Sequence, residues 1–357
     1  MKTEELKEYL AYPDTVVVDA LQKIDKNSRG ILFIVNEREE LVGTITDGDV
    51  RRWLIKTGDL QAPVNRLMNK DPKYLYANNL ADYRSYLKRY SIRIAPVVTA
   101  DNVVCDLVVA DEDFQCETIR KESLREVPIV IMAGGKGTRL YPYTKVLPKP
   151  LIPIGDIPIM ERIVDRFRDE GAKSFWVTLN YRKNMIKSYF SDLVTDYTMT
   201  YVEENEPLGT AGSLRLIQET FQKPVFVTNC DILIQADYGD IYQYHQESGN
   251  ELTVVTALKN IVVPYGVIHS KEAGQITEME EKPKLSYLIN TGMYVLNAEL
   301  LKEIPEKTFY HMTDLVNDLL KQNRKVGMYP ISEDSFLDMG EFEEMRRMEQ
   351  KLNLKAD

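Results

Sequence analysis

Cysteine is scarce in this sequence, with three residues, Cys105, Cys116 and Cys230, spread over 357 positions. This spacing excludes a disulfide framework and a cysteine-rich zinc site, and it predicts a reducing compartment. Long apolar runs are lacking too, because nowhere do about 18 apolar residues follow one another, and the charged start, Met1 to Glu8, has no apolar signal segment. We therefore expect a cytoplasmic protein that is neither exported nor membrane-spanning.

Positive charge is also in short supply. Lys and Arg number 45 against 55 Asp and Glu, which gives a net charge of −10 at pH 7. This deficit argues against a protein whose main task is to hold nucleic acid or an anionic membrane, so neither partner is expected. The 44% of hydrophobic and 28% of charged residues are typical of a folded globular protein. At ~150 residues per domain, the length predicts about two domains.

The N-terminal region contains an internal repeat. Residues 29–49 align with residues 92–112 at a constant offset of 63, which matches apolar positions such as Ile31 with Ile94 and Ile45 with Val108. Each half reads as a short helix, two short apolar strands around a polar turn and a second helical segment, the last being less clear after Asp113. A unit this small buries its apolar face only against its twin, so we expect the halves to dock.

This duplicated β-α-β-β-α pattern resembles a tandem pair of CBS domains over residues 1–122, with repeats at about 1–62 and 63–122. The first half carries that family's Gly-x-x-Thr-x-x-Asp pattern as Gly43, Thr46 and Asp49. The resemblance implies that Thr46 and Asp49 bind an adenine nucleotide, and it suggests a homo-oligomer formed through this pair. The second half departs from the pattern, so at most one such site is expected. Alternatively, these residues are ordinary turn and helix-cap residues and the pair only packs or dimerises.

From Val127 onward, apolar runs of strand length alternate with helical periodicity. This alternation predicts an α/β fold with a Rossmann-like, mostly parallel sheet over residues 126–357, helices on both faces and ligands at the carboxyl ends of the strands. The predicted strands are 128–132, 175–179, 199–202, 225–228 and 252–257, and the predicted helices are 158–170, 184–191, 211–221, 239–247 and 341–352.

A glycine-rich segment follows the first of these strands. It runs Ala133-Gly134-Gly135-Lys136-Gly137-Thr138-Arg139-Leu140, and Leu140 stands where a dinucleotide fingerprint would have its third glycine. Such a turn lets backbone N–H groups approach phosphate oxygens. Nearby cations strengthen this interpretation, among them Lys149, which lies between two prolines. We therefore expect a phosphate-binding loop here.

The segment from Gly134 to Leu151 is similar to the signature of the sugar-1-phosphate nucleotidylyltransferases. Further pieces follow in that family's order, namely Pro207 to Gly212, Asn229-Cys230-Asp231, Pro264 to Val267, Glu280 to Pro283, Asn290-Thr291-Gly292 and Leu337 to Gly340. The likeness extends over roughly residues 127–350. It implies that a sugar-1-phosphate oxygen attacks the α-phosphorus of a nucleoside triphosphate while pyrophosphate leaves in line. Charge neutralisation and alignment would then carry most of the catalysis.

The resemblance also implies the roles of individual residues. Arg139 and Lys149 would contact the triphosphate, Lys282 would hold the sugar phosphate, and Asp231 and Asp338 would share one Mg²⁺ with phosphate oxygens and water. Singly, each of the last three residues has a purely structural alternative as a helix cap, a turn residue or a solvated lysine. The expected nucleotide-binding residues are Ala133, Gly134, Gly135, Gly137, Thr138, Glu204, Gly209 and Thr210, and the expected sugar-binding residues are Gly266, Glu281, Asn290 and Thr291.

Glu204 bears on the identity of the base. Uridylyl- and thymidylyltransferases of this family tend to place a Gln five residues before the position of Gly209, whereas this chain has Glu204. A carboxylate only accepts hydrogen bonds, so it suits guanine, which presents two donors on one edge. GTP is therefore favoured. Alternatively, Glu204 is a solvated strand-end residue, with Glu206 close enough to confuse the register.

Within the family, the whole chain resembles the guanylyltransferases that act on glucosamine 1-phosphate in legionaminic acid biosynthesis. Among the stretches that carry this likeness are Ile45 to Arg52, Leu147 to Ile154 and Leu258-Lys259-Asn260. We expect an Mg²⁺-dependent transfer from GTP to a hexose 1-phosphate, with glucosamine 1-phosphate favoured. The alternatives are a heptose-1-phosphate guanylyltransferase and an enzyme that uses UTP or dTTP. A different class of function is an adenine nucleotide sensor with an inactive transferase domain.

Overall fold

The computed structural model describes residues 6–27, 29–78, 80, 83–90, 92–110, 122–340 and 342–352. The chain forms two compact units. The first contains Met1–Thr118, Leu258–Leu288 and Ser332–Asp334, and the second contains Ile119–Ala257, Ile289–Ile331 and Ser335–Asp357. Two segments of the predicted C-terminal domain therefore belong to the first unit. No helix among the described residues is long and apolar enough to cross a membrane.

The repeat is visible in the backbone of the first unit. Two three-stranded sheets, β1-β2-β3 and β4-β5-β6, are built alike. Ile31 pairs with Thr46 in the first, and Ile94 pairs with Val109 in the second, which is the same register at the offset of 63. The elements are β1 (Leu10–Ala11), α2 (Val17–Asn27), β2 (Ile31–Val35), β3 (Leu41–Thr46), α3 (Asp47–Thr57), β4 (Leu75–Tyr76), α4 (Tyr83–Tyr90), β5 (Ile94–Val98) and β6 (Val104–Val109).

The two halves dock as expected. Phe33 and Leu41 of the first sheet share one buried apolar cluster with Ile94 and Val98 of the second. Each sheet thereby covers an apolar face that its own repeat could not bury. The helical segment expected after Asp113 lies outside the described residues.

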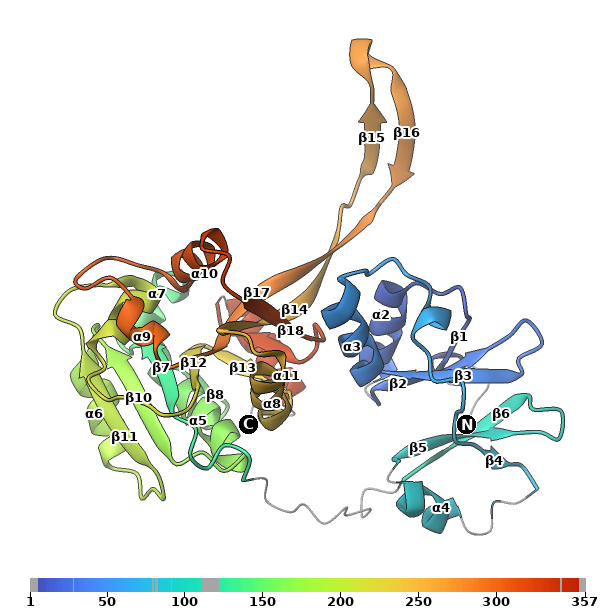
Figure 1. The fold of residues 1–357 in the computed structure, drawn as a ribbon, viewed down its shortest axis with the longest axis horizontal. Coiled ribbons are helices and arrows are strands. Elements are labelled where there is room, and N and C mark those ends of the chain that lie inside the picture. Colours follow the sequence, from blue (N-terminus) through green and yellow to red (C-terminus); the bar gives the residue numbers. More distant parts are fainter. Residues whose placement is uncertain are drawn as a thin grey trace. The chain divides into compact units, whose positions relative to one another are not determined.

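A long β-hairpin completes the first unit. It extends from β14 (Leu252–Val262) and β17 (Lys284–Leu296) into the antiparallel pair β15 (Gly266–Ser270) and β16 (Ile276–Glu281) (Figure 1). At its root, Leu258 joins the buried cluster of α2 and β2, and the Gln22 side-chain amide donates to the Asn260 side-chain oxygen over 3.3 Å. Every residue of β16 is exposed.

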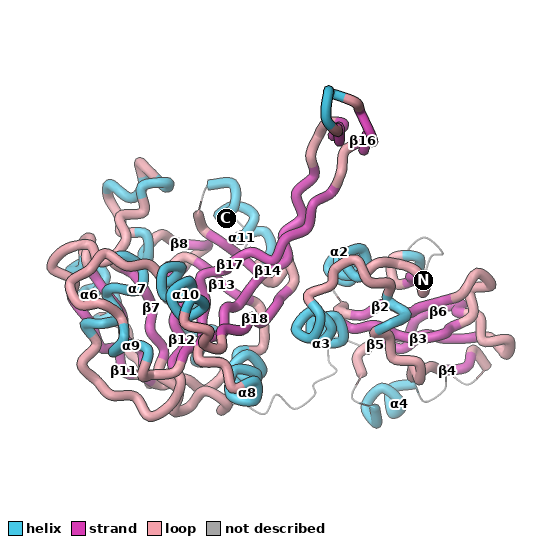
Figure 2. Tube along the Cα trace, turned by 45° about the horizontal axis from the view of Figure 1, so that its top comes forward, coloured by secondary structure: helices cyan, strands magenta, loops and turns pink. Residues whose placement is uncertain are grey.

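The second unit contains the predicted, mostly parallel sheet, which appears in magenta among cyan helices in Figure 2. Its strand order is β11-β10-β7-β12-β17-β14-β18, and β11, β10, β7 and β12 run parallel to their neighbours in that group. The strands not yet given are β7 (Ile129–Ala133), β10 (Ser174–Leu179), β11 (Thr198–Glu203), β12 (Val225–Asn229) and β18 (Val326–Ile331).

Helices cover both faces of this sheet. Along β7, Ile129 and Ile131 pack into one buried cluster, whereas Val130 and Met132 pack into another, because successive side chains of a strand point to opposite faces. The first cluster includes α5 (Ile159–Asp169), α6 (Lys183–Ser191) and α8 (Tyr238–Ser248). The second cluster includes α9 (Leu300–Glu303) and α10 (Met312–Lys321). A further helix, α11, spans Phe342–Lys351.

The predicted helix 211–221 is wrong. The structure has only the short turn α7 (Gly209–Gly212) and a 3₁₀ turn at Ser213–Leu216. The helical turns stop there because the backbone at Ile217 is extended, with φ −69° and ψ 117°. The N–H groups of Ala211 and Gly212 donate to the Tyr310 carbonyl oxygen over 2.9 Å. This tertiary contact satisfies N–H groups that the first turn of a helix leaves without an intrahelical partner.

Candidate active site

A cavity of about 420 Å³ opens where the loops after β7 and β12 begin, at the carboxyl ends of these parallel strands. The sequence predicted this position. Ten of the predicted site residues line the cavity, namely Gly134, Gly135, Gly137, Thr138, Arg139, Lys149, Glu204, Gly209, Thr210 and Asp231. Ala133 is the buried last residue of β7 and is not among the lining residues.

The glycine loop is shaped by close packing. Gly137 has a φ of +64°, and a Cβ there would lie 2.9 Å from the Thr144 side chain and 3.0 Å from Cβ of Lys149. Only glycine fits both the backbone conformation and the space. Lys149 begins a 3₁₀ turn directly after Pro148 and is 7% exposed. The loop and the lysine therefore hold each other in place.

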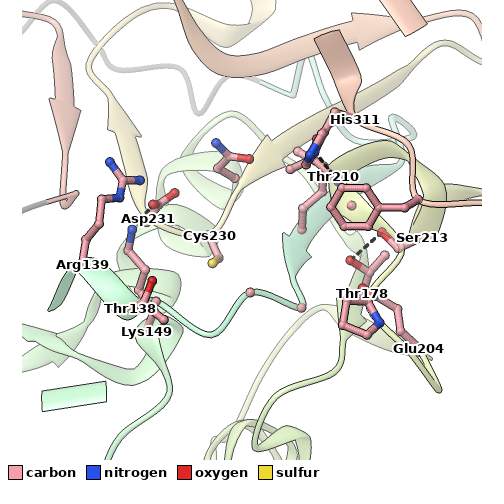
Figure 3. A pocket seen from close by; sticks show the side chains of 18 residues that line it. Thr138, Arg139, Lys149, Thr178, Glu204, Thr210, Ser213, Cys230, Asp231 and His311 are labelled. Carbon is pink, nitrogen blue, oxygen red and sulfur yellow. Dashed lines mark hydrogen bonds and ion pairs between the residues drawn. The ribbon is translucent and has the colours of Figure 1, made fainter. Parts of the chain in front are cut away.

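Four charged side chains meet at one end of the cavity. The Lys149 ammonium forms a salt bridge with Asp231, and Figure 3 shows both beside Arg139. Asp338 lies next to them because β13 (Ile232–Ile234) pairs with β19 (Phe336–Asp338), and the Met339 N–H donates to the Asp231 carbonyl oxygen over 2.9 Å. Burial and the neighbouring Asp231 raise the pKa of Asp338, while Lys149 and Arg139 oppose this shift.

These residues fit the predicted Mg²⁺ site. Asp231 and Asp338 offer carboxylate oxygens, the ligands that Mg²⁺ prefers. Lys149 compensates the charge of Asp231, whereas no salt bridge among the described residues compensates that of Asp338. A cation between the carboxylates would supply that compensation. Across the described ranges, no group of three or more His, Cys, Asp or Glu is placed to hold a metal, so phosphate oxygens and water would complete the coordination.

The opposite end of the cavity holds Glu204, which Figure 3 shows near Thr178 and Ser213. Glu204 is 5% exposed, so it is not a solvated strand-end residue. Its carboxylate accepts the Leu208 N–H over 3.3 Å. Burial raises the pKa of Glu204, and this hydrogen bond opposes the shift. A Cβ on Gly134 would lie 2.4 Å from Glu204 Oε1, so the carboxylate lies directly against the glycine loop.

A second cavity, of about 340 Å³, shares Arg139, Thr210 and Asp231 with the first. Two predicted sugar-binding residues of β17, Asn290 and Thr291, line it together with Asp338. The Asn290 side-chain amide donates to the Tyr294 hydroxyl over 2.7 Å, and the Thr291 hydroxyl donates to the Val255 carbonyl over 2.7 Å. Asp231 therefore lies where the two cavities meet, and Asp338 lies on the side of the predicted sugar site.

Three predicted residues are not brought to these cavities. Gly266 and Glu281 face each other in the β15–β16 pair of the first unit, and Lys282 follows directly. Both charged side chains are mostly exposed, and the Lys282 ammonium lies 4.0 Å from a Glu281 carboxylate oxygen. None of the three lines either cavity. Their roles in binding the sugar phosphate stay predictions.

Phe309 and His311 line the first cavity although no sequence motif pointed to them. They lie in the connection between α9 and α10, which carries no glycine or charge pattern typical of a site. His311 also lines the second cavity. Only the tertiary contact of this connection with the turn at Gly209–Gly212 brings both side chains to the site.

The predicted CBS ligands form a helix cap. The Thr46 hydroxyl accepts the Asp49 N–H over 3.2 Å, and the Asp49 carboxylate accepts the Thr46 N–H over 2.9 Å. Arg52 donates to the same carboxylate over 2.6 Å. This reciprocal capping box begins α3. It gives both residues the structural role that the sequence left open as the alternative.

Comparisons with known proteins agree with this geometry. The nucleotidyl transferase family profile matches residues 129–354, and the CBS domain profile matches residues 7–56. Mannose-1-phosphate guanyltransferase of Debaryomyces hansenii is 33% identical over 187 residues, which are 50% of this chain and 52% of that protein. UTP–glucose-1-phosphate uridylyltransferase of Synechocystis sp. is 33% identical over 233 residues, which are 59% of each chain. The chain thus spans about half the length of the curated relatives it matches.

Solved structures show the same fold. HddC from Yersinia pseudotuberculosis superposes with a TM-score of 0.50 at 24% identity, over 63% of this chain and 99% of that one. A putative glucose-1-phosphate thymidylyltransferase from Bacillus anthracis gives a TM-score of 0.51 at 22% identity, over 65% of this chain and 96% of that one. Because the family profile covers more than half of the sequence, the chain belongs to the nucleotidyl transferase family and carries a CBS domain ahead of the transferase fold.

Proposed function

We propose that this protein is an Mg²⁺-dependent guanylyltransferase, which transfers GMP from GTP to a sugar 1-phosphate and releases pyrophosphate. The observation that carries the proposal is the meeting of Arg139, Lys149, Asp231 and Asp338 between two cavities beside the glycine loop. Two anionic substrates must approach each other in this reaction, so a site of this kind needs fixed cations and room for both.

In this reaction, the charged residues and the glycine loop have separate roles. An oxygen of the sugar phosphate forms a bond to the α-phosphorus of GTP, and the bond from that phosphorus to the β-phosphate breaks as pyrophosphate leaves. Arg139 and Lys149 neutralise the charge that both phosphates bring, and the N–H groups of the glycine loop orient the triphosphate. Asp231 and Asp338 would hold Mg²⁺, which supplies Lewis-acid stabilisation of the reacting phosphoryl oxygens.

The preference for GTP rests on Glu204. Its buried carboxylate accepts one backbone hydrogen bond, and no lysine or arginine among the described residues pairs with it. Guanine would satisfy the remaining acceptor capacity, because its N1–H and its exocyclic amine both donate to a carboxylate. Relatives named as guanyltransferases are consistent with this choice.

The sugar is proposed as glucosamine 1-phosphate, in the synthesis of a legionaminic-acid-type nucleotide sugar, on the resemblance of the whole chain. Asn290 and Thr291 would contact it from β17. Mannose 1-phosphate and a heptose 1-phosphate are the competing acceptors, and UTP or dTTP are the competing donors. An inactive nucleotide sensor is the alternative from another class.

An assay of pyrophosphate release tests the proposed substrates, the competing substrates and the sensor alternative. The full-length protein is assayed with Mg²⁺ and each pairing of GTP, ATP, UTP and dTTP with glucosamine, mannose, glucose and heptose 1-phosphates. We expect the highest kcat/KM with GTP and glucosamine 1-phosphate. Turnover with another pair would correct the substrate, and no turnover with any pair would favour the sensor.

The Glu204→Gln variant tests the base contact. An amide replaces one acceptor with a donor, so kcat/KM with GTP should fall by about 10- to 100-fold, the cost of losing hydrogen bonds to a charged group, while the value with UTP should hold or rise. The matched control is Glu206→Gln, which changes an exposed carboxylate two residues away. An unchanged ratio of GTP to UTP in Glu204→Gln would remove Glu204 from base recognition.

A further inference from the structure

The segment Thr308 to Met312 is fastened to the turn that follows Glu204. The Tyr310 N–H donates to the Leu208 carbonyl over 2.9 Å, and the Tyr310 carbonyl accepts from both Ala211 and Gly212. The Met312 N–H donates to the Thr210 hydroxyl over 2.9 Å. These bonds fix the backbone directly after residue 309.

Glycines allow this close approach. A Cβ on Gly209 would lie 2.6 Å from the Tyr310 carbonyl oxygen, and a Cβ on Gly212 would lie 2.6 Å from the Thr308 carbonyl oxygen. Real Cβ atoms do not come that close to backbone oxygens, so both positions need glycine for the two segments to touch. The attachment is therefore built into the sequence of the turn.

The attachment places Phe309 at the end of the cavity where Glu204 lies. Leu208 links the two, because its N–H donates to the Glu204 carboxylate and its carbonyl accepts from Tyr310. Phe309 lines the cavity and is 62% exposed. A ligand that covers this ring would remove apolar surface from water, which is favourable for a side chain as large as Phe.

His311 orients the ring. The ring centroids of Phe309 and His311 lie 4.8 Å apart with an interplanar angle of 82°, an edge-to-face arrangement. The His311 Nδ1 lies 3.4 Å from both the backbone nitrogen and the hydroxyl oxygen of Thr210. An edge-to-face contact with one imidazole leaves a face of the phenyl ring free to stack on a planar group.

We propose that Phe309 is a specificity-determining residue that stacks on the purine base of the bound nucleoside triphosphate, with His311 as its positioning residue. The proposal rests on the proposed nucleotidyl transfer. Glu204 reads the edge of the base by hydrogen bonds, whereas Phe309 covers its face. A purine offers two fused rings to the phenyl ring and a pyrimidine offers one, so the stack favours GTP over UTP and dTTP.

Steady-state kinetics test the stack. In Phe309→Ala, the KM for GTP should rise by about 10- to 100-fold, in line with the loss of one base–aromatic stack, while kcat stays near the wild-type value because no group at the reacting phosphorus changes. The KM for UTP should rise less. Phe309→Tyr should keep the wild-type KM for GTP. An unchanged KM in Phe309→Ala, or an equal loss for GTP and UTP, would overturn the proposal.

A fluorescent variant reports the contact without turnover. In Phe309→Trp, GTP added without a sugar phosphate should quench the new indole emission over the range of its KM, because a stacked guanine lies against the ring. The matched control is Leu320→Trp, which adds a tryptophan at a position on α10 that is 52% exposed and lines neither cavity. Quenching in both variants or in neither would contradict stacking at position 309.

The two hypotheses fail in different ways. If the wild-type protein turns over but the variants at Phe309 behave as wild type, the stacking proposal is wrong and the transferase stands. If the wild-type protein releases pyrophosphate with no pair of substrates, the proposed function fails, and quenching in Phe309→Trp still decides whether a purine nucleotide binds at this ring.

Discussion

Replacing Lys149 with Met should separate the two tasks proposed for this lysine, which are to neutralise substrate phosphate and to balance the charges of Asp231 and Asp338. Met keeps most of the length of the side chain and removes its charge. The side chains of Lys149 and Asp231 are 9% and 14% exposed, so the pair is almost fully withdrawn from water. Removing one partner of a buried ion pair costs about 3–5 kcal/mol.

That cost should lower the melting temperature by roughly 6–20 °C, at about 2–4 °C per kcal/mol for a unit of this size. Turnover should fall on the order of 10²-fold or more, as for the loss of a preorganised electrostatic group. Mg²⁺ should restore stability to the variant more than to the wild type, because the ammonium no longer competes with the metal for Asp231.

Thermal unfolding with and without Mg²⁺, together with pyrophosphate release, measures these effects. The matched control is Lys223→Met, which breaks the exposed ion pair with Glu126 in the same unit and should change neither quantity much, because solvent screens that pair. Near wild-type turnover in Lys149→Met would refute the charge argument. A melting temperature that responds to Mg²⁺ no more than in the wild type would refute the metal site.

Two further predictions concern the attachment between the turn at Gly209–Gly212 and the segment Thr308 to Met312, and the stability of the first unit. Gly209 has a φ of +79°, and a Cβ there would lie 2.6 Å from the Tyr310 carbonyl oxygen, so Gly209→Ala should separate the turn from the segment that carries Phe309. The KM for GTP should then rise as in Phe309→Ala. An unchanged KM would show that this attachment is not needed for GTP binding. Burial, and then the charges of Asp334 and Asp47, raises the pKa of Asp25 to about 7. The folded state therefore binds a proton that the unfolded state releases, and the stability of the first unit should fall as the pH rises from about 4 to about 7. Asp25→Asn should flatten that dependence and raise the melting temperature at pH 8, and a pH profile that matches the wild type would contradict it.

The sequence predicted those parts of the fold and site that depend on local pattern. The repeat offset, the parallel strands and the glycine loop all follow from apolar periodicity and turn residues, which act over a few positions. The helix expected at 211–221 is absent because the backbone becomes extended at Ile217, and the turn before it is held by the Tyr310 carbonyl, about a hundred residues away, which accepts from Ala211 and Gly212. Periodicity carries no information about such a partner.

The site residues also fall into those that local sequence pattern reveals and those that depend on a distant contact. Arg139, Lys149, Asp231 and Asp338 stand in motifs with fixed spacing, and the structure brings them together. Phe309 and His311 reach the cavity only through a backbone contact between distant segments, and nothing near them in the sequence marks that contact. Charged residues in motifs of fixed spacing could be recognised from the sequence. Phe309 and His311 could not, because a backbone contact between distant segments brings them to the cavity.

The root of the long hairpin has a practical consequence for dissecting this protein. Leu258 is 1% exposed because side chains of the first repeat cover it, and Leu288 packs against the same cluster. A fragment that starts at residue 126 would strip both leucines of that cover and leave them facing water on adjoining strands of its own sheet. Such a fragment should aggregate, so the transferase-fold half is best purified with the first repeat attached.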